Sequence, residues 1–213
     1  MSKKKTTDKK TVRKKPATQN TEQKIMEAAR KLFTEYGYHG TKTRDIAKEA
    51  GINLALLNYY FRSKDKLFEM IVKENTVSFM QDIVSIINNE STSIEEKLKL
   101  LVENYINMFM VNPDVPLFIM THAKRDDPRM RMREKMMESF FMKQVIQAKA
   151  EGKIGSIDPF NLVLNLVSMT IFPFIARRVM QGSKGMNDQQ FAALMTQRKQ
   201  LIPKWIGAML KVQ

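Results

Sequence analysis

Cysteine is absent from the 213-residue chain, and histidine occurs only at His39 and His122. Without thiolates there can be neither a disulfide nor a cysteine metal site, and two imidazoles far apart in the sequence are too few to predict a metal centre. The sequence also lacks the Ser-His-Asp, paired-carboxylate and phosphate-loop spacings from which a reaction could be named. We therefore expect no metal site, no cofactor and no enzymatic activity.

Long apolar runs and strand-like alternation are missing as well. The most apolar segment, residues 160–176 (FNLVLNLVSMTIFPFIA), is interrupted by two asparagines, a serine and a threonine, and it is too short to span a membrane cleanly. No apolar stretch follows the basic N-terminus, so this terminus does not have the pattern of a secretory signal. These absences favour a cytoplasmic protein that does not act at a membrane.

Positive charge, by contrast, is abundant. The formal net charge is +14, and residues 1–20 alone contain eight Lys or Arg and one acidic residue. Because this segment has no apolar periodicity, we expect residues 1–19 to form a disordered basic tail. The charge favours a polyanionic partner such as nucleic acid. The tail either adds contacts to phosphates or the minor groove, or it only improves solubility.

Apolar residues recur with helical spacing from Asn20 onward, which predicts an all-α fold. The first helix is expected to start at a cap on Asn20 or Thr21 and to end at Gly37. Thr43, Asn53 and Ser63 have the residue types of N-caps for the next three helices. Later helices are expected at about 64–88, 93–111, 114–125, 128–151, 158–181 and 188–211.

Two short helices joined by the turn at 51–53 form the pattern of a helix-turn-helix motif, whose second helix can enter the major groove of DNA. Leu57 and Phe61, four residues apart, should face the domain core. Ala55, Asn58 and Tyr59 form a second face that the core does not need. Small Ala55 allows a close approach to a groove, and Asn58 and Tyr59 suit base edges and phosphates. Each residue taken singly is more typical of an ordinary solvent-facing position, and it is their joint spacing that favours a DNA-binding face.

The run TRDIAKEAGINLALLNYYFRSKDKLF, residues 43–68, closely resembles the DNA-binding domain of the tetracycline-repressor (TetR) family. The preceding residues 25–41, with the pattern I-x-x-A-A-x-x-L-F-x-x-x-G-Y-x-G-T, resemble the first helix and turn of that family. The resemblance implies a homodimeric, all-helical transcriptional regulator, usually a repressor that a small ligand releases from a palindromic operator. It assigns DNA contacts to Thr43, Arg44, Leu54, Ala55, Leu56, Asn58, Tyr59, Tyr60 and Lys64.

The sequence departs from the family pattern within the expected recognition helix. Asn58 stands where many members have tyrosine, and Leu54 and Leu56 replace polar groups that often read bases. We therefore expect the preference for a DNA sequence to depend on thymine-methyl contacts, on Arg44 and on DNA shape.

Three regions follow from this interpretation: the tail at 1–19, a DNA-binding domain at 20–66 with its motif at about 43–62, and a helical regulatory and dimerisation domain at 67–213. The resemblance makes the helices at about 158–181 and 188–211 candidates for the dimer interface, and a fully intramolecular core is the alternative. Aromatic and methionine side chains of the middle helices suggest a pocket for a small apolar or amphipathic effector. Its candidate residues are Phe109, Phe118, His122, Met137, Phe140 and Phe141.

A different class of function remains open at this point. A non-specific, architectural nucleic-acid-binding protein would explain the positive charge, but not the second face of the expected recognition helix or the long helical remainder.

Overall fold

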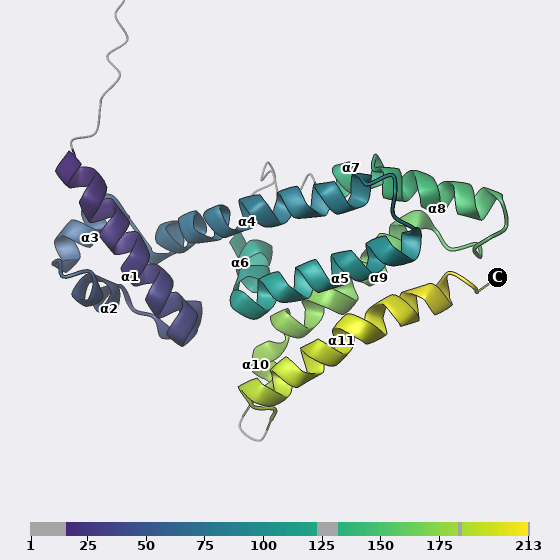
Figure 1. The fold of residues 1–213 in the computed structure, drawn as a ribbon. Helices are drawn as coiled ribbons and strands as arrows, with labels where there is room; N and C mark the ends of the chain where they lie inside the picture. The colour runs from purple at the N-terminus through teal and green to yellow at the C-terminus, as the bar shows by residue number, and fades with distance from the viewer. Residues whose placement is uncertain (1–15, 123–131, 183–184, 213) are drawn as a thin grey trace, which may run out of the picture. The chain divides into compact units, whose positions relative to one another are not determined.

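The fold was analysed in a computed structural model that describes residues 16–122, 132–182 and 185–212. These residues form helices and contain no strand, which confirms the predicted all-α fold (Figure 1). The helices are α1 Pro16–Gly40, α2 Thr43–Glu49, α3 Leu54–Tyr60, α4 Lys64–Asn88, α5 Ile94–Val111, α6 Val115–His122, α7 Met132–Met137, α8 Phe140–Ala150, α9 Pro159–Ile175, α10 Arg177–Met180 and α11 Asp188–Met209.

The chain divides into two compact units within α4, after Ile71. In the first unit, α1 packs against α2 and α2 packs against α3. Their shared core is made of fully buried aliphatic side chains, among them Ile25, Ala29, Ile46, Leu57 and Leu67. Burial of such side chains is the main stabilising contribution to a unit of this size.

The start of α1 differs from the prediction. The helix begins at Pro16, so the expected cap at Asn20 or Thr21 is wrong, and residues 16–19 belong to the helix rather than to a disordered tail. Proline suits the first turn of a helix because its fixed φ is helical and its missing N–H needs no partner there. The rest of the predicted tail, residues 1–15, lies outside the described residues.

Two of the three predicted caps in the motif are confirmed. The side chain of Asn53 accepts a hydrogen bond from the Leu56 amide at 2.8 Å, and the Ser63 hydroxyl accepts one from the Lys66 amide at 3.1 Å. Thr43 is not a cap, because Lys42 holds the extended backbone conformation that precedes α2 and Thr43 is already helical. α2 therefore starts at Thr43, one residue earlier than a cap on the Thr43 side chain would place it.

The second unit is organised around α5, which packs against α8, α9 and α11 (Figure 1). A chain of aromatic contacts crosses its core: the Phe109 ring lies 6.0 Å from Phe79 and 5.5 Å from Phe174, and Phe174 lies 5.5 Å from Phe191. The two pairs that include Phe174 are edge-to-face, an arrangement that stabilises a core beyond simple area burial. The chain of rings thus connects α4, α5, α9 and α11 within this unit.

Two long predicted helices are each divided in the structure. The helix expected at 128–151 is α7 and α8, separated at Ser139, whose hydroxyl accepts from the Met142 amide and starts a new helix; residues 128–131 lie outside the described part. The helix expected at 158–181 is α9 and α10, which meet at Ala176. A capping serine inside an otherwise helical pattern is difficult to distinguish from an exposed helical one.

Pro173 lies within α9 and removes one helical hydrogen bond, the one that would reach the Met169 carbonyl. That carbonyl instead accepts a hydrogen bond of 2.7 Å from the Arg198 guanidinium of α11. Arg198 is partly buried, and its guanidinium carbon lies 5.4 Å from the centre of the Trp205 ring. A side chain from α11 therefore satisfies the carbonyl that the proline leaves open in α9.

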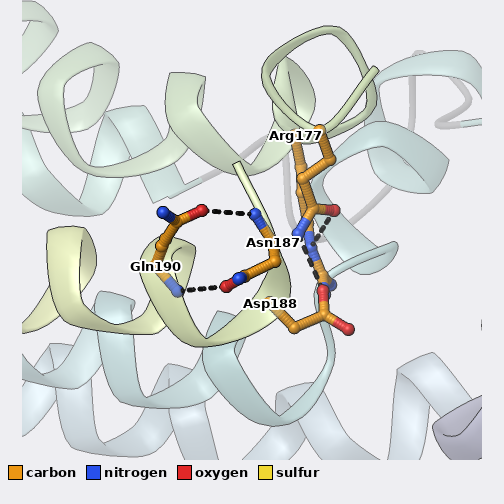
Figure 2. A network of polar contacts seen from close by, with 5 residues as sticks. Arg177, Asn187, Asp188 and Gln190 are labelled. Carbon is orange, nitrogen blue, oxygen red and sulfur yellow. Dashed lines mark hydrogen bonds and ion pairs between the residues drawn. The ribbon is translucent and has the colours of Figure 1, made fainter. Parts of the chain in front are cut away.

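Polar contacts join α10 to the start of α11 (Figure 2). The Asn187 side chain accepts from the Gln190 amide at 2.8 Å, and the Gln190 side chain accepts from the Asn187 amide at 2.9 Å, which completes a capping box. The Arg177 guanidinium of α10 donates to the Asp188 carboxylate at 2.7 Å, and the side-chain amide of Gln181 donates to the same oxygen. These donors, Arg177 first, lower the pKa of Asp188 below its ordinary value.

The lowered pKa of Asp188 predicts how its contribution to stability depends on pH. A carboxyl group whose folded-state pKa is depressed stabilises the fold above its unfolded pKa, and this stabilisation is lost as the pH falls through the folded value. We expect Asp188→Asn to lower the melting temperature slightly near neutral pH. The difference from wild type should begin to shrink as the pH falls below the ordinary carboxyl value of 3.8, and it should vanish below the lowered pKa of the folded state. Asp82→Asn, at an exposed position of α4, is the matched control. A difference that persists unchanged at low pH would contradict this account.

Candidate nucleic-acid interface

The turn between α2 and α3 gives these two helices their geometry. Gly51 has φ +67°, a left-handed conformation that side chains other than glycine rarely adopt. The Ile52 amide donates to the Ala47 carbonyl at 3.0 Å, and the Asn53 side chain then caps α3. The chain can therefore leave α2 and begin α3 within a few residues, as a helix-turn-helix motif requires.

One face of α3 is buried in the first unit. Leu57 is 0% exposed and Phe61, directly after the helix, is 3% exposed. Ile46 and Ala47 of α2 are buried as well. The predicted inner face of α3 is thus confirmed.

The opposite face of α3 is exposed. Ala55 and Asn58 are exposed, and the Tyr59 side chain is 79% exposed, with its ring edge-to-face against Tyr60 at 5.5 Å. Leu56 is also exposed, whereas Leu54 and Tyr60 are half-buried. A small residue beside an amide and a phenol leaves the helix free to approach a nucleic-acid groove closely.

Cationic residues flank this face at both ends of the motif. Arg44, in the first turn of α2, is exposed, as the sequence interpretation requires, and Thr43 beside it is half-buried. The sequence interpretation missed Lys42, which precedes α2, and Arg62, which follows Phe61; both are exposed. Their positions directly beside residues already singled out were the signal that could have found them.

Lys64 occupies a different environment from these cations. Its side chain is half-buried, and its ammonium group donates to the backbone carbonyls of Tyr38 at 2.9 Å and Thr41 at 3.2 Å. The same nitrogen lies 4.2 Å from the centre of the Tyr38 ring. Lys64 thus points into the connection between α1 and α2.

The six residues predicted to line an effector pocket have unlike surroundings. Phe109, Phe118 and Phe141 are buried, Phe140 is half-buried, and His122 and Met137 are exposed. His122 stacks on Phe118 with ring centres 4.3 Å apart, whereas Phe140 lies 5.4 Å from the Lys97 ammonium. Phe109 belongs to the aromatic chain of the α5 core. A shared pocket for these residues stays a prediction.

Lys97 is a buried cation that the sequence interpretation missed. Its ammonium donates to the carbonyl and to the hydroxyl of Thr92, at 2.6 and 2.8 Å. Burial lowers the pKa of Lys97 because it penalises the charged form, and Glu96 opposes that effect. The Gln144 side-chain amide donates to the same Thr92 carbonyl at 3.0 Å. Hydrogen bonds to Thr92 therefore connect the start of α5 with α8.

Neither a metal site nor a membrane span is found where the structure can be described. Residues 16–122, 132–182 and 185–212 contain no group of three or more acidic or histidine residues arranged to hold a metal ion. Within the same ranges, no helix is both long and apolar enough to cross a membrane.

Comparison with known protein families bears directly on the motif. A family model described as "Bacterial regulatory proteins, tetR family" matches residues 25–71, the segment that contains α1 from Ile25, both helices of the motif and the start of α4. Residues 25–71 therefore form a DNA-binding domain of the TetR family. This TetR-family protein is accordingly a DNA-binding transcriptional regulator.

Individual relatives extend the similarity beyond the motif. The TetR-family protein is 27% identical over 164 residues to the probable HTH-type transcriptional regulator YttP of Bacillus subtilis, which covers 73% of this chain and 78% of that protein. It is 35% identical over 101 residues to the biofilm operon negative regulator IcaR of Staphylococcus aureus, which covers 44% of this chain and 54% of IcaR. A TetR/AcrR-family regulator from Thermobifida fusca has the same fold, with a TM-score of 0.57 at 21% identity over 86% of this chain and 97% of that one.

The exposed polar groups of the motif predict how this TetR-family protein would select DNA. We expect the double variant Arg44→Ala, Asn58→Ala to relax base preference at the positions that these side chains face, by about 1–3 kcal/mol for each base-specific hydrogen-bonding pair that the substitutions remove. Selection of duplexes from a random-sequence library by wild type and variant measures this change. A variant that selects the wild-type sequence with undiminished stringency would contradict a role for these two residues in readout.

Proposed function

We propose that this TetR-family protein is a homodimeric repressor that binds a palindromic operator by inserting α3 into the major groove. The observation that carries the proposal is the two-faced character of α3. Leu57 anchors the helix in its unit, while Ala55, Asn58 and Tyr59 face solvent. An α-helix fits the major groove of B-DNA, where these side chains can reach base edges and phosphates.

The roles of the motif residues follow from their exposure. Ala55 and Leu56 offer apolar contact to thymine methyl groups, and Asn58 can hydrogen-bond an adenine edge. Arg44 reaches a guanine edge or the backbone, and Lys42 and Arg62 supply further phosphate contacts on either side of the helix. Of the remaining predicted contacts, Thr43, Leu54, Tyr59 and Tyr60 lie between these positions in the sequence, and Lys64 follows them at the start of α4.

Repression is the direction of regulation that we infer, because IcaR is described as a negative transcriptional regulator. A repressor needs only to occupy its operator and so to exclude other proteins from that DNA. A cytoplasmic location follows from the same role. A small apolar or amphipathic effector that releases the operator remains a prediction.

A genome-wide pull-down of DNA with the full chain tests the function. One or a few palindromic sites are expected, because specific binding exceeds non-specific binding by a large factor at physiological salt. Uniform occupancy of the genome would instead favour an architectural nucleic-acid-binding protein. Absence of DNA binding even at low salt would exclude both proposals.

Dimerisation through α9, α10 and α11 is supported by exposed apolar side chains. Phe160, Leu164 and Phe172 lie on α9 at spacings of four and eight residues, and they are 39%, 50% and 62% exposed. Leu201 and Trp205 on α11 are exposed too, also four residues apart. In a dimer with two-fold symmetry, the second subunit would cover these side chains. The dimer would then carry two copies of α3, one for each half-site of a palindrome.

Placing a charge on this apolar surface should weaken the dimer. We expect Phe172→Glu to raise the dimer dissociation constant by about thirtyfold or more, because it buries an unpaired carboxylate where an aromatic side chain packs. Sedimentation equilibrium over a dilution series measures the change. Ile146→Glu, at an exposed apolar position of α8, is the matched control and should leave the constant unchanged. A wild-type chain that is monomeric, or a Phe172→Glu variant that dimerises normally, would refute this interface.

A further inference from the structure

Tyr105 of α5 is a buried residue, 7% exposed, whose hydroxyl has no hydrogen-bond partner among the described residues. The other buried side chains that end in a polar group are all hydrogen-bonded within the same part of the chain. They are Tyr38, Thr41, Thr76, Lys97, Ser139 and Thr170. A buried polar group without a partner costs free energy, so this exception calls for an explanation.

Two aromatic rings pack against the Tyr105 ring. Phe79 of α4 lies edge-to-face with it, with ring centres 5.1 Å apart, and Phe109, one turn further along α5, lies 6.0 Å away. Phe79 and Phe109 are themselves buried, and their rings are 6.0 Å apart. We call these three residues the Tyr105 cluster. Its surroundings are apolar, and the Tyr105 hydroxyl is the polar group of the cluster.

The Tyr105 cluster is also uncharged. Within the described part of the chain, none of its three rings has a lysine or arginine side chain over it. Rings that do have such a cation are those of Tyr38, Phe140, Phe191 and Trp205. A carboxylate or phosphate placed against the Tyr105 cluster would therefore lack the counter-ion that a buried charge needs. An uncharged ligand is the class that fits this environment.

The protonation state of Tyr105 decides which polar group such a ligand needs. Burial raises the pKa of Tyr105 to about 12, because the ionised form would be a charge in apolar surroundings. The hydroxyl therefore keeps its proton near neutral pH and can donate a hydrogen bond. An acceptor oxygen, such as the carbonyl of a ketone, ester or amide, is the matching group. Ligand sites commonly combine an apolar lining with a few placed polar groups in this way.

The Tyr105 cluster includes a residue of the helix that enters both units. Phe79 lies on α4, which begins in the first unit and ends in the second. In the described residues, the backbone of α4 comes close to other helices at few points, and the ring of Phe79 makes its contacts with α5. A helix with few close contacts is displaced more easily than one packed along its length. A ligand that packs against Phe79 would therefore act directly on α4.

We propose that Tyr105 is the hydrogen-bond donor of an effector site at the contact between α4 and α5, and that the effector is an uncharged, largely apolar molecule with an acceptor oxygen. Phe79 and Phe109 pack against its apolar body. The proposal rests on the proposed control by an effector and deepens it, because it names the chemistry of the effector and the residue that binds its polar group. Tyr105 was not among the pocket residues predicted from the sequence, whereas Phe109 was.

The test uses two probes of nearly the same shape, benzylacetone and n-butylbenzene, which differ by a ketone oxygen. Their binding to the full chain without DNA is followed by NMR, with carbon-13 at Cζ of every tyrosine, and the infrared stretch of the ketone carbonyl is recorded in the complex. Tyr105→Phe removes only the hydroxyl. Tyr38→Phe is the matched control, because the Tyr38 hydroxyl donates to Asp65.

Wild type is expected to bind benzylacetone with a shift of the Tyr105 Cζ signal and a lowered carbonyl stretching frequency. Tyr105→Phe should weaken benzylacetone binding about tenfold and leave n-butylbenzene binding unchanged or tighter. Because the hydroxyl has no protein partner to lose, the melting temperature of free Tyr105→Phe should equal or exceed that of wild type. Tyr38→Phe should lower the melting temperature and leave the binding of both probes unchanged.

Three results would overturn the proposal. Benzylacetone could fail to bind wild type up to its solubility limit. Tyr105→Phe could weaken both probes equally, which would assign the effect to ring packing and not to a hydrogen bond. The free Tyr105→Phe protein could melt below wild type, which would show that the hydroxyl already has a stabilising partner, such as an ordered water.

Control of DNA binding is measured separately, with a duplex that the wild-type protein selects from a random-sequence library. Release of this duplex by benzylacetone from wild type, but not from Tyr105→Phe, would connect the site with the proposed function. Binding through Tyr105 without release would refute effector control by this ligand class while the site itself stands. If wild type selects no DNA sequence, the proposed function fails, and the probe measurements still decide whether Tyr105 binds the ketone.

Discussion

Burial of Leu57 and Phe61 against α2 determines which side of α3 is available to a ligand. Side chains on a helix recur every 3.6 residues, so once two residues four apart are buried, the orientation of every other residue in a seven-residue helix is set. Ala55, Asn58 and Tyr59 face solvent because Leu57 does not. The apolar contact that stabilises the first unit is thus also the constraint that presents its polar surface, and neither role could be changed without the other.

That constraint works only because the turn inside the motif and the turn that precedes it are both held in place. Gly51 and Asn53 set the angle at which the chain passes from α2 into α3, through a left-handed backbone conformation and a side-chain cap. Before the motif, Lys64 and Asp65 contact the turn that precedes α2. A helix as short as α3 has little stability of its own, and its geometry depends on such tertiary contacts.

In the second unit, too, side chains from one helix satisfy backbone carbonyls of another element. Pro173 frees a carbonyl within the apolar helix α9, and Arg198 of α11 reaches across to satisfy it. Elsewhere in the same unit, Lys97 and Gln144 converge on the Thr92 carbonyl and join α5 to α8. In both places, long polar side chains satisfy backbone groups that helix geometry leaves open, while aromatic rings fill the space between the helices.

Much of the fold was predictable because local chemistry determined it. Helical periodicity, the caps at Asn53 and Ser63, and the two faces of α3 depend on residues close together in sequence, and the bounds of α4 were predicted correctly for the same reason. The start of α1 and the break at Ser139 were missed, because a capping residue and an ordinary helical residue have the same local signature. The pocket residues were named from composition alone, and composition does not say which rings share one core.

The sequence by itself determined the all-helical class, the helix-turn-helix motif and the residues that its second helix exposes. Only the tertiary structure decided what Lys64 and Arg198 do, since their partners are backbone carbonyls 23 or more residues away along the chain. Every residue carries such a carbonyl, so no pattern of residue types marks the one that a distant lysine or arginine will reach. Folding selects it by bringing the end of α1 beside α4 and the turn of α9 at Pro173 beside α11.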